Sequence, residues 1–166
     1  MKSPCLKMTT ASFLSPIGWI CIQSKNEELV SVMFSDEKPE DTSQQDILAL
    51  KAVEQLKEYF DGKRISFDLP LRLEGTLFQK KVWEQLTTIP CGETRSYQEI
   101  AQSLNIPKAY RAIGQANSKN RFVIIIPCHR VIHANGALGG YNGGIDRKKW
   151  LLAHEKKEGF NKILFE

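Results

Sequence analysis

No stretch of this 166-residue sequence is apolar for long enough to span a membrane, and no charged leader with an apolar core stands at its start. A membrane-spanning helix needs about 20 predominantly apolar residues, and a secretory signal needs an apolar core of roughly 7 to 15. Both absences argue against a membrane-embedded or exported protein. We therefore expect a cytoplasmic protein with no membrane partner.

Metal-binding and disulfide patterns are also missing. The four cysteines are Cys5, Cys21, Cys91 and Cys128. They lie far apart and form no Cys-x-x-Cys pair, so we expect reduced thiols and no disulfide framework. His129 and His133 are four residues apart, but no His-Glu-x-x-His helix surrounds them. The glycine-rich stretch 138–144 lacks the Gly-Lys-Ser/Thr ending of a phosphate-binding loop. The sequence thus predicts no metal and no cofactor.

What the sequence does have is an uneven charge distribution. Its net charge is +4, but residues 1–75 carry 9 Lys/Arg against 12 Asp/Glu, and residues 76–166 carry 14 against 7. The first part is therefore acidic and the second strongly basic. A basic surplus of this kind fits either a nucleic-acid partner or a well-solvated surface.

The acidic part has the pattern of a small scaffold domain. A turn at 15–18 leads into apolar runs at 19–22 and 29–34, which predict two strands of a hairpin or meander. Apolar residues at spacings of three and four predict a helix from Ser43 to Phe60, closed by Asp61-Gly62. Ile65 to Leu69 predicts a last strand that ends at Pro70, and a linker follows at 71–75.

The basic part is predicted to be mostly helical. Capping boxes at 76–79 and 96–99 begin two helices, and Pro107 is expected to be the first residue of a third. The second and third of these would form a helix-turn-helix. The segment 111–117 pairs one arginine with small side chains, which suits close approach to another surface or tight packing against a helix. Asp146 is predicted to cap a last helix, Arg147 to Lys157.

Ile124 to Val131 is the stretch with the clearest chemistry. Its apolar beginning predicts buried, extended backbone, and Pro127 then bends the chain just before Cys128. A lone cysteine is often only a small core residue. Here His129 and Arg130 follow at once, and cationic neighbours lower a thiol pKa and favour the nucleophilic thiolate. In an extended strand, however, adjacent side chains point to opposite faces.

Four motifs of the basic part follow one another at defined spacings. They are Gly92-Glu93-Thr94-Arg95-Ser96-Tyr97, Arg111-Ala112-Ile113-Gly114 with Asn120, Ile126-Pro127-Cys128-His129-Arg130-Val131, and Trp150-Leu151-Leu152-Ala153-His154-Glu155. Together they resemble the O6-alkylguanine-DNA alkyltransferase family over roughly residues 76–157. The resemblance implies an α/β (α+β) fold with two domains. Residues 1–72 would form a ribonuclease-H-like sheet with a helix, and residues 76–166 a winged helix-turn-helix-like domain that carries the cysteine.

The activity implied by the resemblance is DNA repair by direct, irreversible transfer of a methyl or other alkyl group to Cys128. The donor would be guanine O6, and less readily thymine O4, without a cofactor. Glu155, His129 and a water would lower the thiol pKa. Tyr97 would donate a proton toward the departing base, and Asn120 would hold the corner between helix and nucleophile.

The same resemblance implies a substrate pocket and a DNA-binding surface. The pocket residues would be Pro127, Val131, Tyr141, Asn142 and Gly143. The DNA-binding residues would be Arg111, Ala112, Gly114, Thr94 and Ser96. The target base must leave the stack, and Arg111 would fill the gap. A monomer would bind double-stranded DNA through the minor groove, whereas most helix-turn-helix proteins use the major groove.

Two rival functions remain compatible with parts of this pattern. One is a non-catalytic module that binds alkylated DNA and recruits other factors, and the other is a cysteine hydrolase using Cys128 and His129. The chain also has Asn120-Arg121-Phe122-Val123 where the family often has Asn-Pro-x-Pro, which leaves the tolerance for bulky alkyl groups open.

The charge distribution generates a first prediction. If the basic part contacts phosphates, binding to a DNA duplex should weaken on the order of a hundredfold between 50 and 200 mM salt, because about four contacts would release counterions. Fluorescence anisotropy with a labelled duplex measures this. A flat plot of log affinity against log salt would argue against a DNA partner.

Overall fold

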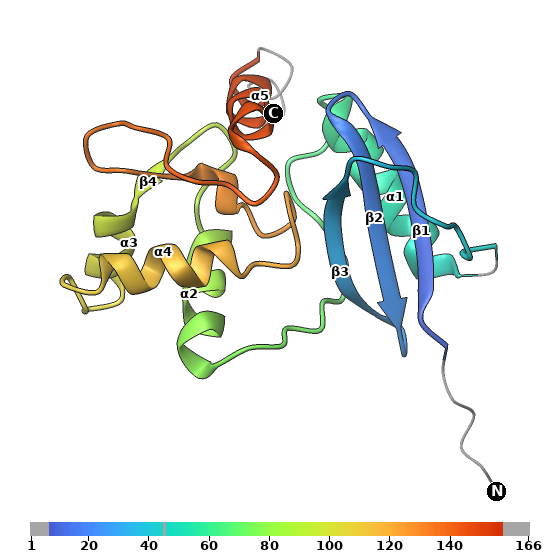
Figure 1. Ribbon diagram of the computed structural model, residues 1–166, viewed down its shortest axis with the longest axis horizontal. Helices are drawn as coiled ribbons and strands as arrows, with labels where there is room; N and C mark the ends of the chain where they lie inside the picture. Colours follow the sequence, from blue (N-terminus) through green and yellow to red (C-terminus); the bar gives the residue numbers. More distant parts are fainter. Residues whose placement is uncertain (1–6, 45, 158–166) are drawn as a thin grey trace, which may run out of the picture. The chain divides into compact units, whose positions relative to one another are not determined.

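The computed structural model describes residues 7–44 and 46–157, and the chain divides into two compact units between Leu73 and Glu74 (Figure 1). The first unit contains β1 (Thr9–Ser15), β2 (Gly18–Lys25), β3 (Glu28–Ser35) and α1 (Ile47–Phe60). The second contains α2 (Leu77–Thr87), β4 (Arg95–Ser96), α3 (Tyr97–Ser103), α4 (Tyr110–Ser118), η1 (Cys128–Arg130), β5 (Val131–Ile132) and α5 (Ile145–Glu155). No helix in the described part of the chain has the length and apolar character needed to cross a bilayer.

The first unit is an antiparallel sheet covered by one helix. The strand order is β1-β2-β3, and α1 lies against the sheet (Figure 1). Alternate strand residues and the apolar side of α1 form the core: Ala11, Phe13, Ile20, Ile22, Leu29, Val32, Ala49, Ala52, Leu56 and Tyr59. The predicted sheet with a helix is confirmed. The strand β1 escaped prediction because its inward positions, Ala11, Phe13 and Ser15, give weak hydrophobic alternation.

Two sequence predictions for this unit are wrong. Residues 65–69 form no strand, because the buried Gln55 side chain takes both backbone groups of Asp68 (3.0 and 3.3 Å). Only Leu71 reaches the sheet, through a single parallel bridge to Leu29. The helix begins at Ile47 instead of Ser43, since Ser43 bonds back to Asp41 and Asp46 supplies the N-cap.

The second unit is mostly helical, as predicted. Both capping boxes form, with Thr76 and Ser96 as N-caps of α2 and α3. Trp83 of α2 is buried and donates from its indole nitrogen to the Ala116 carbonyl of α4 (2.9 Å). The short strands β4 and β5 pair in parallel and bring Ser96 beside Ile132. The strand that leads into α3 therefore lies next to Val131 and Ile132, which follow η1 and Cys128.

Two helix starts differ from prediction. Pro107 lies in a turn closed by a hydrogen bond from Ala109 N to Ile106 O (2.9 Å), so α4 begins only at Tyr110. Proline favours the second position of such turns as well as helix starts, and the turn takes precedence here. Gly144 is the N-cap of α5, and Asp146 lies in its first turn. The helix ends at Glu155, two residues earlier than predicted.

Candidate active site

Cys128 begins a single 3-10 turn, η1, at the end of a buried and irregular segment. The burial of Ile124 and Ile126 agrees with the sequence, but the predicted extended backbone is wrong. Ile124 has a left-handed φ of 71°, and Ile126 N donates to Phe122 O (2.9 Å). The chain therefore turns repeatedly before it reaches Pro127, so the side chains of 128 and 129 do not alternate as they would in a strand.

Asn120 holds this turning segment in place. Its side chain is buried, accepts from Phe122 N (2.9 Å) and donates to Ile126 O (2.8 Å) and Phe122 O (3.3 Å). These bonds satisfy backbone groups that a strand would have paired. Asn120 thus lies between the end of α4 and Cys128, and its side chain holds the backbone of the segment that joins them.

Glu155 is a fully buried carboxylate on which several elements converge. Its Oε1 lies 2.7 Å from His129 Nε2 and 2.9 Å from Arg130 Nη2, and its Oε2 accepts from Arg130 Nε (2.9 Å). Oε2 also lies 3.4 Å from the backbone nitrogen of Gly92, whose φ of +85° favours glycine. Arg130 further donates to Ile89 O (2.7 Å). Helix α5, η1 and the loop before β4 therefore meet at one carboxylate.

The charges of this cluster follow from its contacts. Burial acts to raise the pKa of Glu155, but His129 and the Arg130 guanidinium outweigh it and hold that pKa well below its usual range. Burial lowers the pKa of His129 despite the opposing effect of Glu155. Because Arg130 is always charged and already balances the carboxylate, we take His129 as neutral. Its Nε2 then carries the proton donated to Glu155, and Nδ1 keeps a lone pair.

The expected lowering of the thiol pKa is not found. Burial raises the pKa of Cys128, while a hydrogen bond from Asn120, the charge of Lys148 and the backbone N–H groups of Cys128 and His129 act in the opposite direction. His129 and Arg130 give little help, because Glu155 engages both. The resting group is consequently a protonated thiol that needs a base before it can attack.

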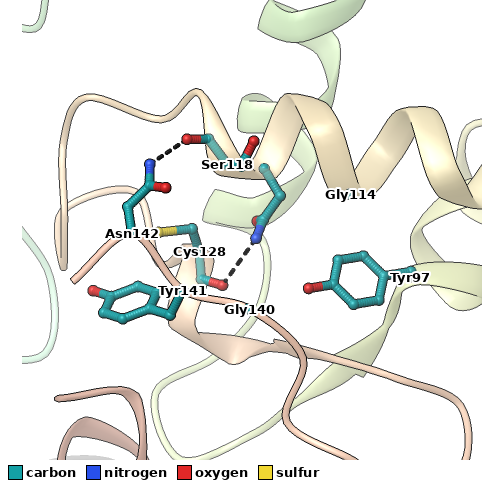
Figure 2. A pocket seen from close by; sticks show the side chains of 8 residues that line it. Tyr97, Gly114, Ser118, Cys128, Gly140, Tyr141 and Asn142 are labelled. Carbon is teal, nitrogen blue, oxygen red and sulfur yellow. Dashed lines mark hydrogen bonds between the residues drawn. The ribbon is translucent and has the colours of Figure 1, made fainter. Parts of the chain in front are cut away.

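A cavity of about 230 Å³ opens at Cys128 (Figure 2). Its lining residues are Tyr97, Gly114, Asn117, Ser118, Cys128, Gly140, Tyr141 and Asn142. The Tyr97 hydroxyl points toward Cys128 in Figure 2. Burial, and to a smaller extent the negative charge of a Cys128 thiolate, raise the pKa of Tyr97. Tyr97 is thus a protonated phenol beside the thiol. A cavity with a thiol, a proton donor and a nearby imidazole can carry out nucleophilic displacement.

The predicted pocket residues are only partly at this cavity. Tyr141 and Asn142 line it, and Asn142 donates from its side chain to the carbonyl of Ser118 on α4. Pro127, Val131 and Gly143 are not among the lining residues. Pro127 and Val131 are buried on either side of Cys128 in sequence and shape the turn itself.

Among the predicted DNA-binding residues, Arg111 is exposed on α4 with its guanidinium over the Tyr110 ring (6.0 Å). Gly114 lies on the same helix and lines the cavity, with Ala112 half-buried beside it. Thr94 is half-buried, and the Ser96 hydroxyl is occupied as the N-cap of α3. Contacts of these residues with DNA stay predictions.

Sequence reasoning missed three lining residues and one buried cation. Asn117 and Ser118 lie three and four positions after Gly114, so helical periodicity could have placed them on the same side of α4. Gly140 adjoins Tyr141 in the glycine-rich stretch. Lys148 of α5 is fully buried, and nothing in its local sequence distinguishes it from its exposed neighbour Lys149.

His129 and His133, which are four residues apart in sequence, have different partners. His129 contacts Glu155, whereas the ring of His133 lies 5.1 Å from that of Tyr97. Over residues 7–44 and 46–157, no three histidine, cysteine or carboxylate side chains come together as a metal site would require.

Comparisons with known proteins match both units. Residues 8–73 match the model of the "6-O-methylguanine DNA methyltransferase, ribonuclease-like domain", and residues 77–157 match the "6-O-methylguanine DNA methyltransferase, DNA binding domain". The methylated-DNA–protein-cysteine methyltransferase of Mycolicibacterium paratuberculosis is 45% identical over 147 residues, covering 86% of this chain and 89% of that protein.

Solved structures give the same result. The crystal structure of the Mycobacterium tuberculosis O6-methylguanine methyltransferase is 42% identical and has a TM-score of 0.81, with 90% of this chain and 93% of that chain covered. A second structure of that bacterium's protein, in complex with DNA, is 45% identical with a TM-score of 0.78 and covers 87% and 91% of the two chains.

The convergence on Glu155 generates a prediction about stability. Glu155→Gln should reduce the free energy of unfolding by about 3 kcal/mol at pH 7, because the buried Arg130 loses its counter-charge. Urea unfolding followed by tryptophan fluorescence measures the change. The exposed Glu84→Gln serves as control and should change stability by less than about 0.5 kcal/mol.

The pH dependence has a definite sign. Since the folded pKa of Glu155 is lowered, its contribution is complete above the usual glutamate pKa of about 4.3 and is lost as pH falls below it. The Glu155→Gln variant, which is neutral at this position, should therefore lose less stability than the wild type between pH 5 and 3. Parallel losses in the two proteins would contradict the ion pair.

Proposed function

Because this chain belongs to the O6-methylguanine DNA methyltransferase family, we propose that Cys128 is the cysteine that accepts the methyl group. The protein repairs O6-methylguanine in DNA by transferring the methyl group to its own cysteine. The observation that carries the assignment is the position of Cys128, which lines a cavity together with Tyr97 and lies next in sequence to the Glu155-bound His129.

The other thiols are poor candidates. Cys91 is buried beside Glu155, and burial together with that carboxylate raises the pKa of Cys91 to about 12. Cys21 belongs to β2 of the first unit, and burial raises the pKa of its thiol too. Cys5 lies outside the described residues. Among the three cysteines in the described part of the chain, Cys128 is the one that lines a cavity with room for a substrate and lies next in sequence to a candidate base, His129.

The proton of Cys128 must leave before attack. Glu155 fixes the proton of His129 on Nε2, so Nδ1 has a lone pair, and this atom is buried with no hydrogen-bond partner among the described residues. We propose that the Cys128 thiol gives its proton to Nδ1 of His129 through one bridging water. Glu155 then stabilises the imidazolium.

Displacement completes the transfer. A sulfur lone pair forms the bond to the methyl carbon, and the electron pair of the carbon–oxygen bond moves onto the guanine. The Tyr97 hydroxyl gives its proton to the base, and the protonated His129 restores the phenol proton through solvent. The product thioether has no good leaving group, so Cys128 is consumed.

DNA recognition is assigned to the second unit. It holds most of the positive charge, and its α3–turn–α4 pair presents Arg111 on the surface. We propose that a monomer binds double-stranded DNA through the minor groove, with the small Ala112 and Gly114 allowing close approach. Arg111 would fill the space left by the flipped base. A lesion-binding module without chemistry would have no use for the buried Glu155–His129 pair beside a thiol.

The first test concerns the nucleophile. Cys128→Ser should abolish methyl transfer while leaving duplex affinity within about twofold, because a hydroxyl is a far weaker nucleophile than a thiolate at neutral pH. Wild-type protein mixed with excess methylated duplex should transfer about one methyl group per chain and then stop. Sustained turnover, or transfer by the serine variant at the wild-type rate, would refute the assignment.

The second test concerns base flipping. Arg111→Ala should slow repair of a methylated duplex by at least about tenfold but leave the reaction with free O6-methylguanine unchanged, since the free base needs no flipping. Arg121→Ala, which removes the same charge from an exposed site, is the matched control and should lose much less. Equal losses on duplex and free base would remove Arg111 from this role.

A further inference from the structure

Asn117 is a buried amide on the cavity wall that the steps above do not use. It lies in the last turn of α4, one turn after Gly114, and it lines the cavity at Cys128 (Figure 2). Only 5% of its surface is exposed. Buried polar side chains in native proteins are hydrogen-bonded, with few exceptions. One of the two polar atoms of Asn117 is such an exception.

The two polar atoms of this amide have different surroundings. Nδ2 donates to the backbone carbonyl of Cys128 (3.4 Å). Because a carbonyl oxygen can only accept, this contact fixes which side of the amide is nitrogen and which is oxygen. Oδ1 is buried and has no hydrogen-bond partner among residues 7–44 and 46–157. The cavity wall therefore carries an unpaired acceptor that is tethered to the backbone of the nucleophile.

The neighbouring donors on this wall are engaged elsewhere. The Ser118 hydroxyl donates to Gln115 O (2.7 Å), and the side-chain amide of Asn142 donates to Ser118 O. The Tyr97 hydroxyl is the proton donor assigned above to the departing base. A buried acceptor without a partner costs stability, and a ligand that brings a donor to it recovers that cost. The donor for Asn117 is thus expected to come with the substrate.

An O6-alkylated guanine offers one donor only. Its N1, N3, N7 and O6 carry no hydrogen, and N9 is bonded to the sugar in DNA, so the exocyclic 2-amino group holds the only N–H bonds of the base. This amino group and O6 lie on the same edge of the ring, the edge along which flipped bases are read. A base that presents its O6-methyl group to the sulfur of Cys128 brings this edge toward the residue that Asn117 binds.

We propose that Oδ1 of Asn117 accepts a hydrogen bond from the 2-amino group of the flipped base and so makes the cavity selective for guanine. The inference rests on the proposed function and adds the substrate group that this residue recognises. O6-methylhypoxanthine, which has hydrogen in place of the amino group, and O4-methylthymine have no such donor. Either base would leave the buried acceptor unpaired in the complex, which is how a site built for an N–H group rejects analogues that lack it.

Two substrates that differ only in the 2-amino group test the proposal. The full-length protein is reacted with duplexes that carry O6-methylguanine or O6-methylhypoxanthine at the same position, and the rate of methyl transfer to the protein is measured for each. Wild-type protein should react about tenfold or more faster with methylguanine, the effect of one buried hydrogen bond. Asn117→Leu keeps the approximate size of the side chain and removes both polar atoms. Its ratio of the two rates should fall to within about twofold of one, since neither substrate can form the bond.

The ratio of rates separates recognition from a structural role. If Asn117 only supported the Cys128 carbonyl, Asn117→Leu would slow both substrates equally and leave the ratio unchanged. Gln115→Leu, which removes an exposed amide from the same helix, is the matched control and should keep the wild-type ratio. A duplex with O4-methylthymine gives a second readout. Its rate relative to O6-methylguanine should rise by about tenfold in Asn117→Leu and not in Gln115→Leu.

A wild-type ratio near one, or an Asn117→Leu ratio equal to that of the wild type, would overturn the proposal. If Asn117→Leu does not fold, Asn117→Ala, which adds no bulk, is measured in the same way and must show the same fall in the ratio. If wild-type Cys128 is not methylated by the O6-methylguanine duplex, the proposed function fails, independently of Asn117.

Discussion

The buried carboxylate of Glu155 is the constraint on which the rest of the active site depends. It accepts hydrogen bonds from His129 and Arg130, which directly follow the nucleophile in sequence and lie 26 and 25 residues before Glu155. Burying a carboxylate is expensive unless it is paired and hydrogen-bonded, and here both of its oxygens are satisfied. The hydrogen bond to Glu155 also orients His129, so a substitution that removes the carboxylate would also displace the proposed base.

The Glu155 cluster explains why the thiol of Cys128 is protonated in the resting protein. An adjacent cation would ordinarily activate a cysteine, but Glu155 balances the charge of Arg130, His129 is neutral, and burial raises the pKa of Cys128. A protein that is consumed in one reaction benefits from a nucleophile that stays protonated until a base and a substrate are in place. Asn120, which follows α4, and Lys148 of α5 act to lower the pKa of that thiol, and Tyr97 of α3 lines the same cavity.

Local signals were predictable from the sequence, and long-range ones were not. The two capping boxes and the Asp61-Gly62 helix end depend on residues within four positions, and all formed as predicted. The family motifs singled out Cys128, Tyr97, Tyr141 and Asn142, and these residues line one cavity. The strand predicted at 65–69 does not form because the side chain of Gln55, 13 residues before Asp68, hydrogen-bonds the backbone of Asp68. The predicted lowering of the Cys128 pKa is wrong because Glu155 engages the neighbouring His129 and Arg130. Lys148 could not be distinguished from Lys149 without the backbone carbonyls that its ammonium binds.

The most direct test of this account is to locate the transferred group. The protein would be reacted with a duplex that carries one O6-methylguanine with a deuterated methyl group, then digested and analysed by peptide mass. The account predicts the added mass on the peptide that contains Cys128 and on no other cysteine peptide. A label on Cys5, Cys21 or Cys91, or on a residue other than cysteine, would contradict it.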